Sequence, residues 1–145
     1  MHVSQIDFHI LDNKDNSSLL VYACRVARKA YNNGYRVYIR VENEQDMQQL
    51  DTLLWTFSEL DFIPHASIAT ECGQEPVIIG MIEHTGDSNM VLINISTKMA
   101  SNYSRYSRVI ELISNDPGCK SAGRNRYRKY QQMNEKLNNH VVSVN

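Results

Sequence analysis

A basic, tyrosine-rich stretch near the end of the chain has the clearest capacity for recognition. Residues 105–130 hold seven basic and two acidic residues, which is a net charge of +5. Tyr103, Tyr106, Tyr127 and Tyr130 lie in or beside this stretch. Cations interleaved with aromatic rings suit an acidic peptide or single-stranded nucleic acid. The alternative is a solvated helix face above packed tyrosines.

The charge of this stretch contrasts with that of the preceding chain. Residues 1–104 hold seven basic and thirteen acidic residues, a net charge of −6, while the whole chain carries −1. Such asymmetry indicates that the C-terminal part meets an acidic partner. It also argues against a groove that tracks single-stranded DNA, because such a groove would extend beyond one helix.

Aromatic residues form a second candidate recognition group. Residues 53–65 contain the only tryptophan and two of the three phenylalanines. We expect Leu53 and Leu54 to belong to the hydrophobic core. Trp55 fits either the core or an exposed interface anchor, since aromatic side chains dominate binding hot spots.

Catalytic motifs are absent from the sequence. The six glycines are scattered and form neither GxGxxG nor GxxxxGK[ST], so no phosphate-binding loop is indicated. The five histidines include no HExxH pair, and no GxSxG nucleophile motif occurs. We interpret His9, inside an expected strand, as structural. We therefore predict no catalytic residues, no metal and no cofactor.

Length and composition predict one globular domain over residues 1–145. The chain is 42% hydrophobic and 21% charged, close to globular averages. No apolar run approaches the ~18 residues of a membrane span, and the N-terminus does not resemble a signal peptide. The three cysteines form no CxxC pair and no disulfide framework, and we expect Cys24 to lie in the core. These features indicate a cytoplasmic protein with no membrane partner.

Hydrophobic periodicity predicts alternating strands and helices. A mostly apolar strand over residues 3–11 is followed by polar cap residues and a helical stripe over residues 17–31, which Asn33-Gly34 ends. A strand over 36–41 and an Asn43-capped helix complete a βαβ-helix unit, which implies parallel pairing. We predict an α/β domain with a mostly parallel sheet and helices on both faces. Further expected elements are strands at 77–82, 90–95 and 109–113, a turn at Asp116-Pro117-Gly118, and a helix from Lys120 to Leu137.

Several of these segments together resemble the chi subunit family of bacterial DNA polymerase III. The resemblance rests on the opening strand, AYNNGYRVYI at 30–39, LDTLLWTF at 50–57, FIPH at 62–65, and RNRYRKY at 124–130, in one order. It extends to about residue 131. The combination of LDTLLWTF, FIPH and the late RxRYxxY helix is fairly specific, although each piece alone is weak.

The resemblance implies a non-catalytic Rossmann-like domain that serves the clamp-loader complex. It implies binding to the acidic C-terminal tail of single-stranded DNA-binding protein (SSB) through Lys120, Arg124 and Tyr127, and contact with nucleic acid only through SSB. It also implies binding to the psi subunit, or to a repair helicase, through Trp55 and Phe62.

Two departures from the family pattern concern the C-terminal region. Pro117-Gly118 precedes Lys120 where relatives have a more regular lead-in, and residues 138–145 match nothing recognisable. Two other functions stay open at this point. The same basic-aromatic patch could bind single-stranded DNA directly, or the α/β pattern could belong to a small nucleotide-binding enzyme, against which the missing glycine loop counts.

Overall fold

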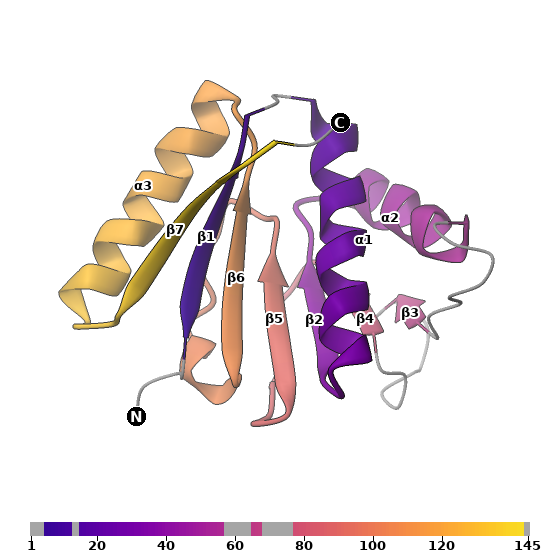
Figure 1. Ribbon diagram of the computed structural model, residues 1–145, viewed down its shortest axis with the longest axis horizontal. Helices are drawn as coiled ribbons and strands as arrows, with labels where there is room; N and C mark the ends of the chain where they lie inside the picture. Colours follow the sequence, from indigo (N-terminus) through magenta and orange to yellow (C-terminus); the bar gives the residue numbers. More distant parts are fainter. Residues whose placement is uncertain (1–4, 13–14, 57–64, 68–76, 144–145) are drawn as a thin grey trace.

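The sheet that organises the molecule is entirely parallel. A computed structural model describes residues 5–12, 15–56, 65–67 and 77–143. Within these ranges, seven strands form one sheet and every pair of neighbours is parallel (Figure 1). The strands are β1 (Ile6–Leu11), β2 (Arg36–Arg40), β3 (His65–Ser67), β4 (Val77–Gly80), β5 (Met90–Asn94), β6 (Arg108–Ile113) and β7 (Leu137–Val142), and the helices are α1 (Asn16–Asn32), α2 (Glu44–Thr56), α3 (Pro117–Gln132) and the 3-10 turn η1 (Tyr103–Arg105).

The strand order is β3-β4-β2-β5-β6-β1-β7. The first strand of the chain therefore lies between two of the last, with Ile6 opposite Val109 of β6 and Leu137 of β7. The expected parallel sheet is confirmed, and the strands expected at 3–11, 36–41, 77–82, 90–95 and 109–113 correspond to β1, β2, β4, β5 and β6.

Two hydrophobic cores lie on opposite faces of the sheet. Alternation along β1 sends Leu11 into a core with residues of α1 and α2, while Ile6 and Phe8 join a second core with Tyr130 of α3. Helices thus cover both faces, as expected, with α1 and α2 on one and α3 on the other (Figure 1). Cys24 is fully buried in the first core, which confirms the prediction for it.

The caps of α1 and α2 explain where these helices begin. Asp15 precedes α1, and its side chain accepts a hydrogen bond from the Ser17 backbone N–H at 3.1 Å. The side chain of Asn43 does the same for the Asp46 N–H at 2.8 Å. After α1, Gly34 adopts φ +89°, a left-handed conformation that suits glycine.

The expected boundaries of the final helix were wrong at both ends. Asp116 is not part of a turn but caps α3, and Pro117 occupies its first turn, where the fixed φ of proline suits a helix. The helix ends at Gln132, and Asn134 has φ 61°, which stops helical propagation. The chain then forms β7, a strand that we did not predict, and β3 was not predicted either.

Candidate functional site

The start of α3 positions the three basic-aromatic residues that the sequence singled out. The Asp116 side chain accepts a hydrogen bond from the Cys119 N–H at 3.1 Å, so the helix is already formed at Lys120. Arg124 and Tyr127 follow at spacings of four and three residues. All three side chains therefore project from one face of α3.

A buried polar cluster fixes the inner side of α3 to β6. Glu111 is fully buried, and its carboxylate accepts hydrogen bonds from Arg126 Nε at 3.0 Å and from the Tyr130 hydroxyl at 2.7 Å. Asn94 of β5 donates a third at 3.0 Å, and Arg126 also donates to the Thr97 carbonyl at 3.0 Å. Each member is satisfied by another, which fixes the helix in position on the sheet.

Burial controls the protonation of this cluster. Desolvation raises the pKa of the Glu111 carboxyl, while the charge of Arg126 and the hydrogen bonds from Tyr130, Arg126 and Asn94 oppose that rise. Desolvation, followed by the proximity of Glu111, raises the pKa of Tyr130. The cluster is internally saturated, so it is not a source of free charge for a ligand.

Gly123 allows α3 to approach the sheet closely. A Cβ atom at this position would collide with the Cδ1 atom of Ile113 on β6. The Ile113 side chain fills the space beside Gly123, and both residues line a cavity next to the helix. A larger residue at position 123 would have to displace Ile113 or move α3, and either change would alter the cavity lining.

The cavity has a volume of about 430 Å³ and lies between α3 and the sheet. Its apolar wall comes from strands that are distant in sequence, with Phe8 and Ile10 on β1 and Ile113 on β6. Its polar lining comes from α3 and β7. The other lining residues are Lys120, Gly123, Arg124, Tyr127 and Asn139.

Tyr127 is the fixed aromatic wall of this cavity. Its ring meets that of Phe8 edge-on, with centroids 5.1 Å apart and an interplanar angle of 66°. Its hydroxyl accepts a hydrogen bond from Asn139 Nδ2 at 3.1 Å. These two contacts hold the ring in place before any ligand arrives.

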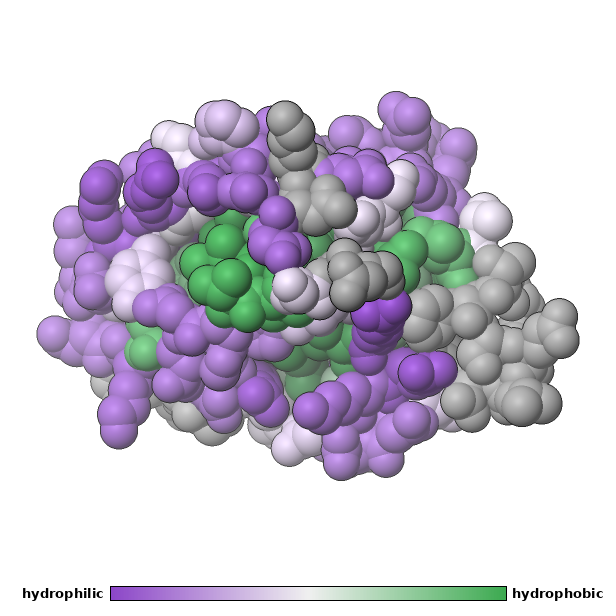
Figure 2. Space-filling view, turned by 45° about the horizontal axis from the view of Figure 1, so that its top comes forward, coloured by the Kyte–Doolittle hydropathy of each residue, from purple (hydrophilic) through white to green (hydrophobic). Residues whose placement is uncertain are grey.

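The two cations at the cavity have no ionic partner among the residues that the structure describes. Lys120 is half-buried and Arg124 is exposed. Neither forms a salt bridge with any residue of the described ranges. Figure 2 shows an apolar area ringed by hydrophilic side chains in the half of the molecule that carries α3 and β7. An apolar pocket with cations at its rim can bind an apolar side chain that bears a carboxylate.

The structure thus brings together Lys120, Arg124 and Tyr127, as the sequence predicted. Sequence reasoning missed Phe8, Ile10, Ile113 and Asn139. The alternation of β1 could have placed Phe8 and Ile10 on one face, but their proximity to α3 depends on long-range strand order.

The expected second recognition surface lies mostly outside the residues that the structure describes. Trp55 belongs to the last turn of α2, and its side chain lies outside the described residues, as does the whole of Phe62. Leu54 is buried and Leu53 packs against the first core, which confirms the expectation for both.

Other kinds of site find no support in the described part of the chain. It contains no group of three or more His, Cys, Asp or Glu side chains that could hold a metal ion. None of its helices is long and apolar enough to cross a bilayer.

A parallel sheet with helices on both faces places the chain in the Rossmann-like class of α/β domains. The sequence profile of the DNA polymerase III chi subunit family, HolC, matches residues 3–138. The chain belongs to this family, whose members are accessory subunits of DNA replication.

Relatives over nearly the full length agree with this assignment. The chain is 34% identical over 138 residues to the DNA polymerase III subunit chi of Pseudomonas aeruginosa, which covers 95% of this chain and 96% of the relative. It is 28% identical over 138 residues to the Escherichia coli subunit, with 90% and 93% covered, and 26% identical over 126 residues to that of Haemophilus influenzae, with 84% and 86% covered.

Proposed function

We propose that this protein is a non-catalytic adaptor that binds the acidic C-terminal tail of SSB in the α3 cavity and joins it, through the psi subunit, to the clamp loader. The observation that carries this proposal is an apolar pocket lined by two cations that form no salt bridge with any described residue. As a replication subunit it would act in the cytoplasm.

The chemistry of the ligand matches the lining of the cavity. A tail that ends in phenylalanine presents an aromatic ring and a terminal carboxylate next to each other. The ring would contact Phe8, Ile113 and Tyr127, and a cavity of about 430 Å³ has room for it. Arg124, at the rim, would hold the carboxylate through two parallel hydrogen bonds.

Lys120 has a different role in this proposal. It lies one turn before Arg124 on the same face of α3 and offers a mobile point charge. Aspartates upstream in the tail would approach it without being buried. Lys120 would therefore affect the association rate and salt dependence more than the final affinity.

A double-mutant cycle on the carboxylate tests the site directly. Calorimetry compares an acidic tail peptide ending in phenylalanine with the same peptide as a C-terminal amide, against the wild type and Arg124→Ala. We expect Arg124→Ala to weaken binding of the free acid at least ~10-fold, about 1.4 kcal/mol. The amide peptide should bind the wild type weakly, and Arg124→Ala should reduce its affinity little further. Amidation of the peptide and Arg124→Ala both remove the same contact between arginine and carboxylate.

Arg128→Ala is the matched control, since Arg128 is an exposed arginine one turn further on α3 that does not line the cavity. It should leave affinity for the peptide almost unchanged. Equal affinity of the wild type and Arg124→Ala for the free acid, at low and moderate salt, would remove Arg124 from the site.

The second half of the adaptor function is binding of the psi subunit or a helicase, which we propose involves Trp55 and Phe62. Truncating an interface anchor typically costs ~2 kcal/mol or more of binding. We expect Phe62→Ala to lose psi in a pull-down assay while retaining the SSB peptide. Unchanged psi binding by a folded Phe62→Ala variant would remove Phe62 from that surface, and unfolding would make it a core residue.

A further inference from the structure

A second cavity, of about 560 Å³, lies on the opposite face of the sheet from the α3 cavity. It is a groove between α1 and strands β1, β5 and β6, and it runs along α1 from Tyr22 to Asn33. At 1.5 Å per helical residue, that length is roughly 16 Å. No function assigned above uses this groove.

The groove is cationic within an acidic part of the chain. Arg25 and Lys29 line it from successive turns of α1, and Arg108 lines it from β6. No carboxylate is among its lining residues. Neither Arg25 nor Lys29 forms a salt bridge with another residue that the structure describes. Two cations in a row, open to solvent, attract a chain of regularly spaced anions.

Arg108 is held in place by the nearest acid. Its Nε and Nη2 atoms donate to Oδ2 of the buried Asp7 at 3.0 and 2.7 Å. This pairing cancels the charge of Asp7 and leaves the far side of the guanidinium facing the groove, where the Arg108 side chain is 45% exposed. The net charge along the groove therefore comes from α1.

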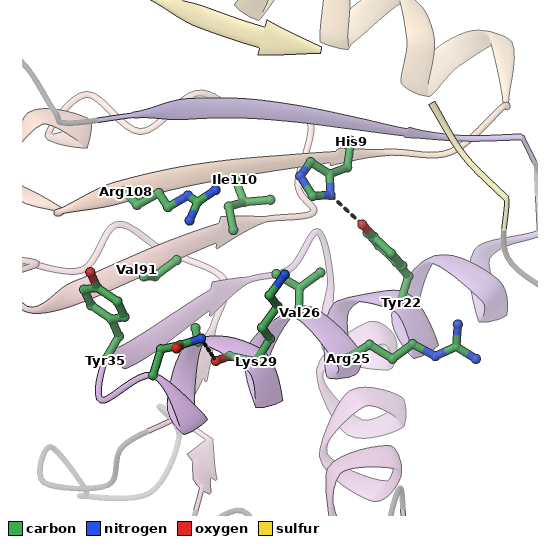
Figure 3. A pocket seen from close by; sticks show the side chains of 11 residues that line it. His9, Tyr22, Arg25, Val26, Lys29, Tyr35, Val91, Arg108 and Ile110 are labelled. Carbon is green, nitrogen blue, oxygen red and sulfur yellow. Dashed lines mark hydrogen bonds between the residues drawn. The ribbon is translucent and has the colours of Figure 1, made fainter. Parts of the chain in front are cut away.

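Aromatic rings mark both ends of the groove. Figure 3 shows His9 and Tyr22 together at one end, Tyr35 and Arg108 towards the other, and Lys29 between the two ends. His9 Nδ1 and the Tyr22 hydroxyl are hydrogen-bonded at 2.5 Å, which orients the Tyr22 ring. Tyr35 is 38% exposed, so it is open to solvent.

We propose that this α1 groove binds a short stretch of single-stranded nucleic acid. Phosphates would lie along Arg25 and Lys29, and bases would stack on Tyr22 and Tyr35. This goes beyond the expectation that nucleic acid is reached only through SSB. An acidic peptide shares the charge complementarity but has no aromatic bases with which two separated rings could stack.

Fluorescence anisotropy with a labelled oligothymidylate of about ten nucleotides, at roughly 50 mM salt, tests the proposal on the full-length protein. We expect Arg25→Gln/Lys29→Gln to weaken binding about 10-fold or more. The slope of log K against log salt should fall by about 1.4, since two phosphate contacts are lost from a single strand. Affinity for the SSB tail peptide should not change.

The rings are tested by a matched pair of variants at one position. Tyr22→Phe keeps the aromatic ring but loses the hydrogen bond to His9, so it should retain most of the affinity for the oligonucleotide. Tyr22→Leu removes the ring and should weaken binding about 10-fold, the typical effect of losing one stacked base. Circular dichroism establishes that each variant is folded.

Arg128→Gln/Lys129→Gln is the charge-matched control, because it removes two exposed cations from α3. An equal loss of affinity in this variant would show unspecific electrostatic attraction and overturn the proposal. No binding by the wild type at low salt would also overturn it. Two competition results would show that the ligand is not a nucleic acid strand. In one, thymidine monophosphate displaces the labelled oligonucleotide as well as unlabelled oligonucleotide does. In the other, an acidic peptide displaces the labelled oligonucleotide from the groove.

Discussion

Asp7 and Glu111 are fully buried carboxylates on neighbouring strands, and each is paired with an arginine. Glu111 faces α3, and its partner Arg126 has a side chain only 5% exposed. Asp7 faces the side of α1, and its partner Arg108 is 45% exposed. One ion pair is closed off from water and the other is open to it.

This difference separates two uses of the same interaction. The Glu111 cluster pairs its one cation, Arg126, internally and fixes a helix, so that other side chains of α3 stay free for a ligand. In the Asp7–Arg108 pair, Asp7 is buried, while Arg108 lines the groove beside α1 and remains accessible. The protonation of the two acids differs accordingly. Although burial alone would raise the pKa of Asp7, hydrogen bonds from Gln5 and Arg108 and the charge of Arg108 hold it below its ordinary value.

The largest expected effect compares Arg126→Met with Arg108→Met by urea denaturation. Arg126→Met leaves Glu111 buried without its cation and should lower the free energy of unfolding by about 3–5 kcal/mol. Arg108→Met should cost clearly less, because Asp7 keeps its hydrogen bonds from Gln5 at 2.9 and 3.0 Å and water can approach. A Glu111→Leu/Arg126→Met double variant should recover part of the loss. Equal costs of the two single variants would break the distinction between a closed and an open pair.

Gly123→Ala tests how tightly the closed side is packed. The new methyl group would collide with Ile113, and such overpacking costs about 1–3 kcal/mol, against which alanine regains up to about 1 kcal/mol of helix propensity. We expect a lower melting temperature and weaker peptide binding, since the cavity narrows. Adding Ile113→Val to Gly123→Ala should restore part of the melting temperature and part of the affinity for the peptide. Unchanged stability would mean that α3 can move away from β6 freely.

The two carboxyls should titrate on opposite sides of their ordinary ranges. Carbon-13 NMR of the side chains should place the pKa of Glu111 above, and that of Asp7 below, the usual values. Because the folded-state pKa of Asp7 is lowered, its stabilising contribution is present above the unfolded pKa and is lost as pH falls through the folded pKa. Asp7→Asn should therefore flatten the acid side of the stability profile, measured by urea denaturation from about pH 5 downward. An unchanged profile would contradict this role.

The smallest effect concerns His9 in the open region. Burial, followed by the charge of His140, lowers the pKa of His9. The two rings meet with centroids 5.1 Å apart. His140→Gln removes the repulsion, so the pKa of His9 should rise yet stay below its ordinary value, because burial remains. Proton NMR titration measures this, with His84 as an internal reference that should not move.

Much of the fold could be predicted because its signals are local. The apolar runs of β2, β4 and β5, the caps at Asp15 and Asn43, and the glycine after α1 each act within a few residues. The grouping of Lys120, Arg124 and Tyr127 is also local, since helical spacing alone puts them on one face.

The unpredicted parts depend on partners far along the chain. The sequence of β7 is largely polar, with Asn138, Asn139 and His140, so it gives no strand pattern. The strand forms nevertheless because it lies at an edge of the sheet, where polar residues are tolerated. The role of Glu111 depends on α3. A lone acid among the apolar residues of β6 was a signal for a buried partner, but it could not identify Arg126.

The place of β1 between β6 and β7 has a consequence for synthesis of the protein. The residues opposite Ile6 are Val109 and Leu137, so β1 has no neighbouring strand until over 100 further residues have been synthesised. At about 5–20 residues per second, that delay is roughly 5–20 s. Phe8 and Ile10 stay uncovered during this interval. The α3 cavity is therefore among the last features to form, and a nascent chain lacking its final strand would carry no complete site.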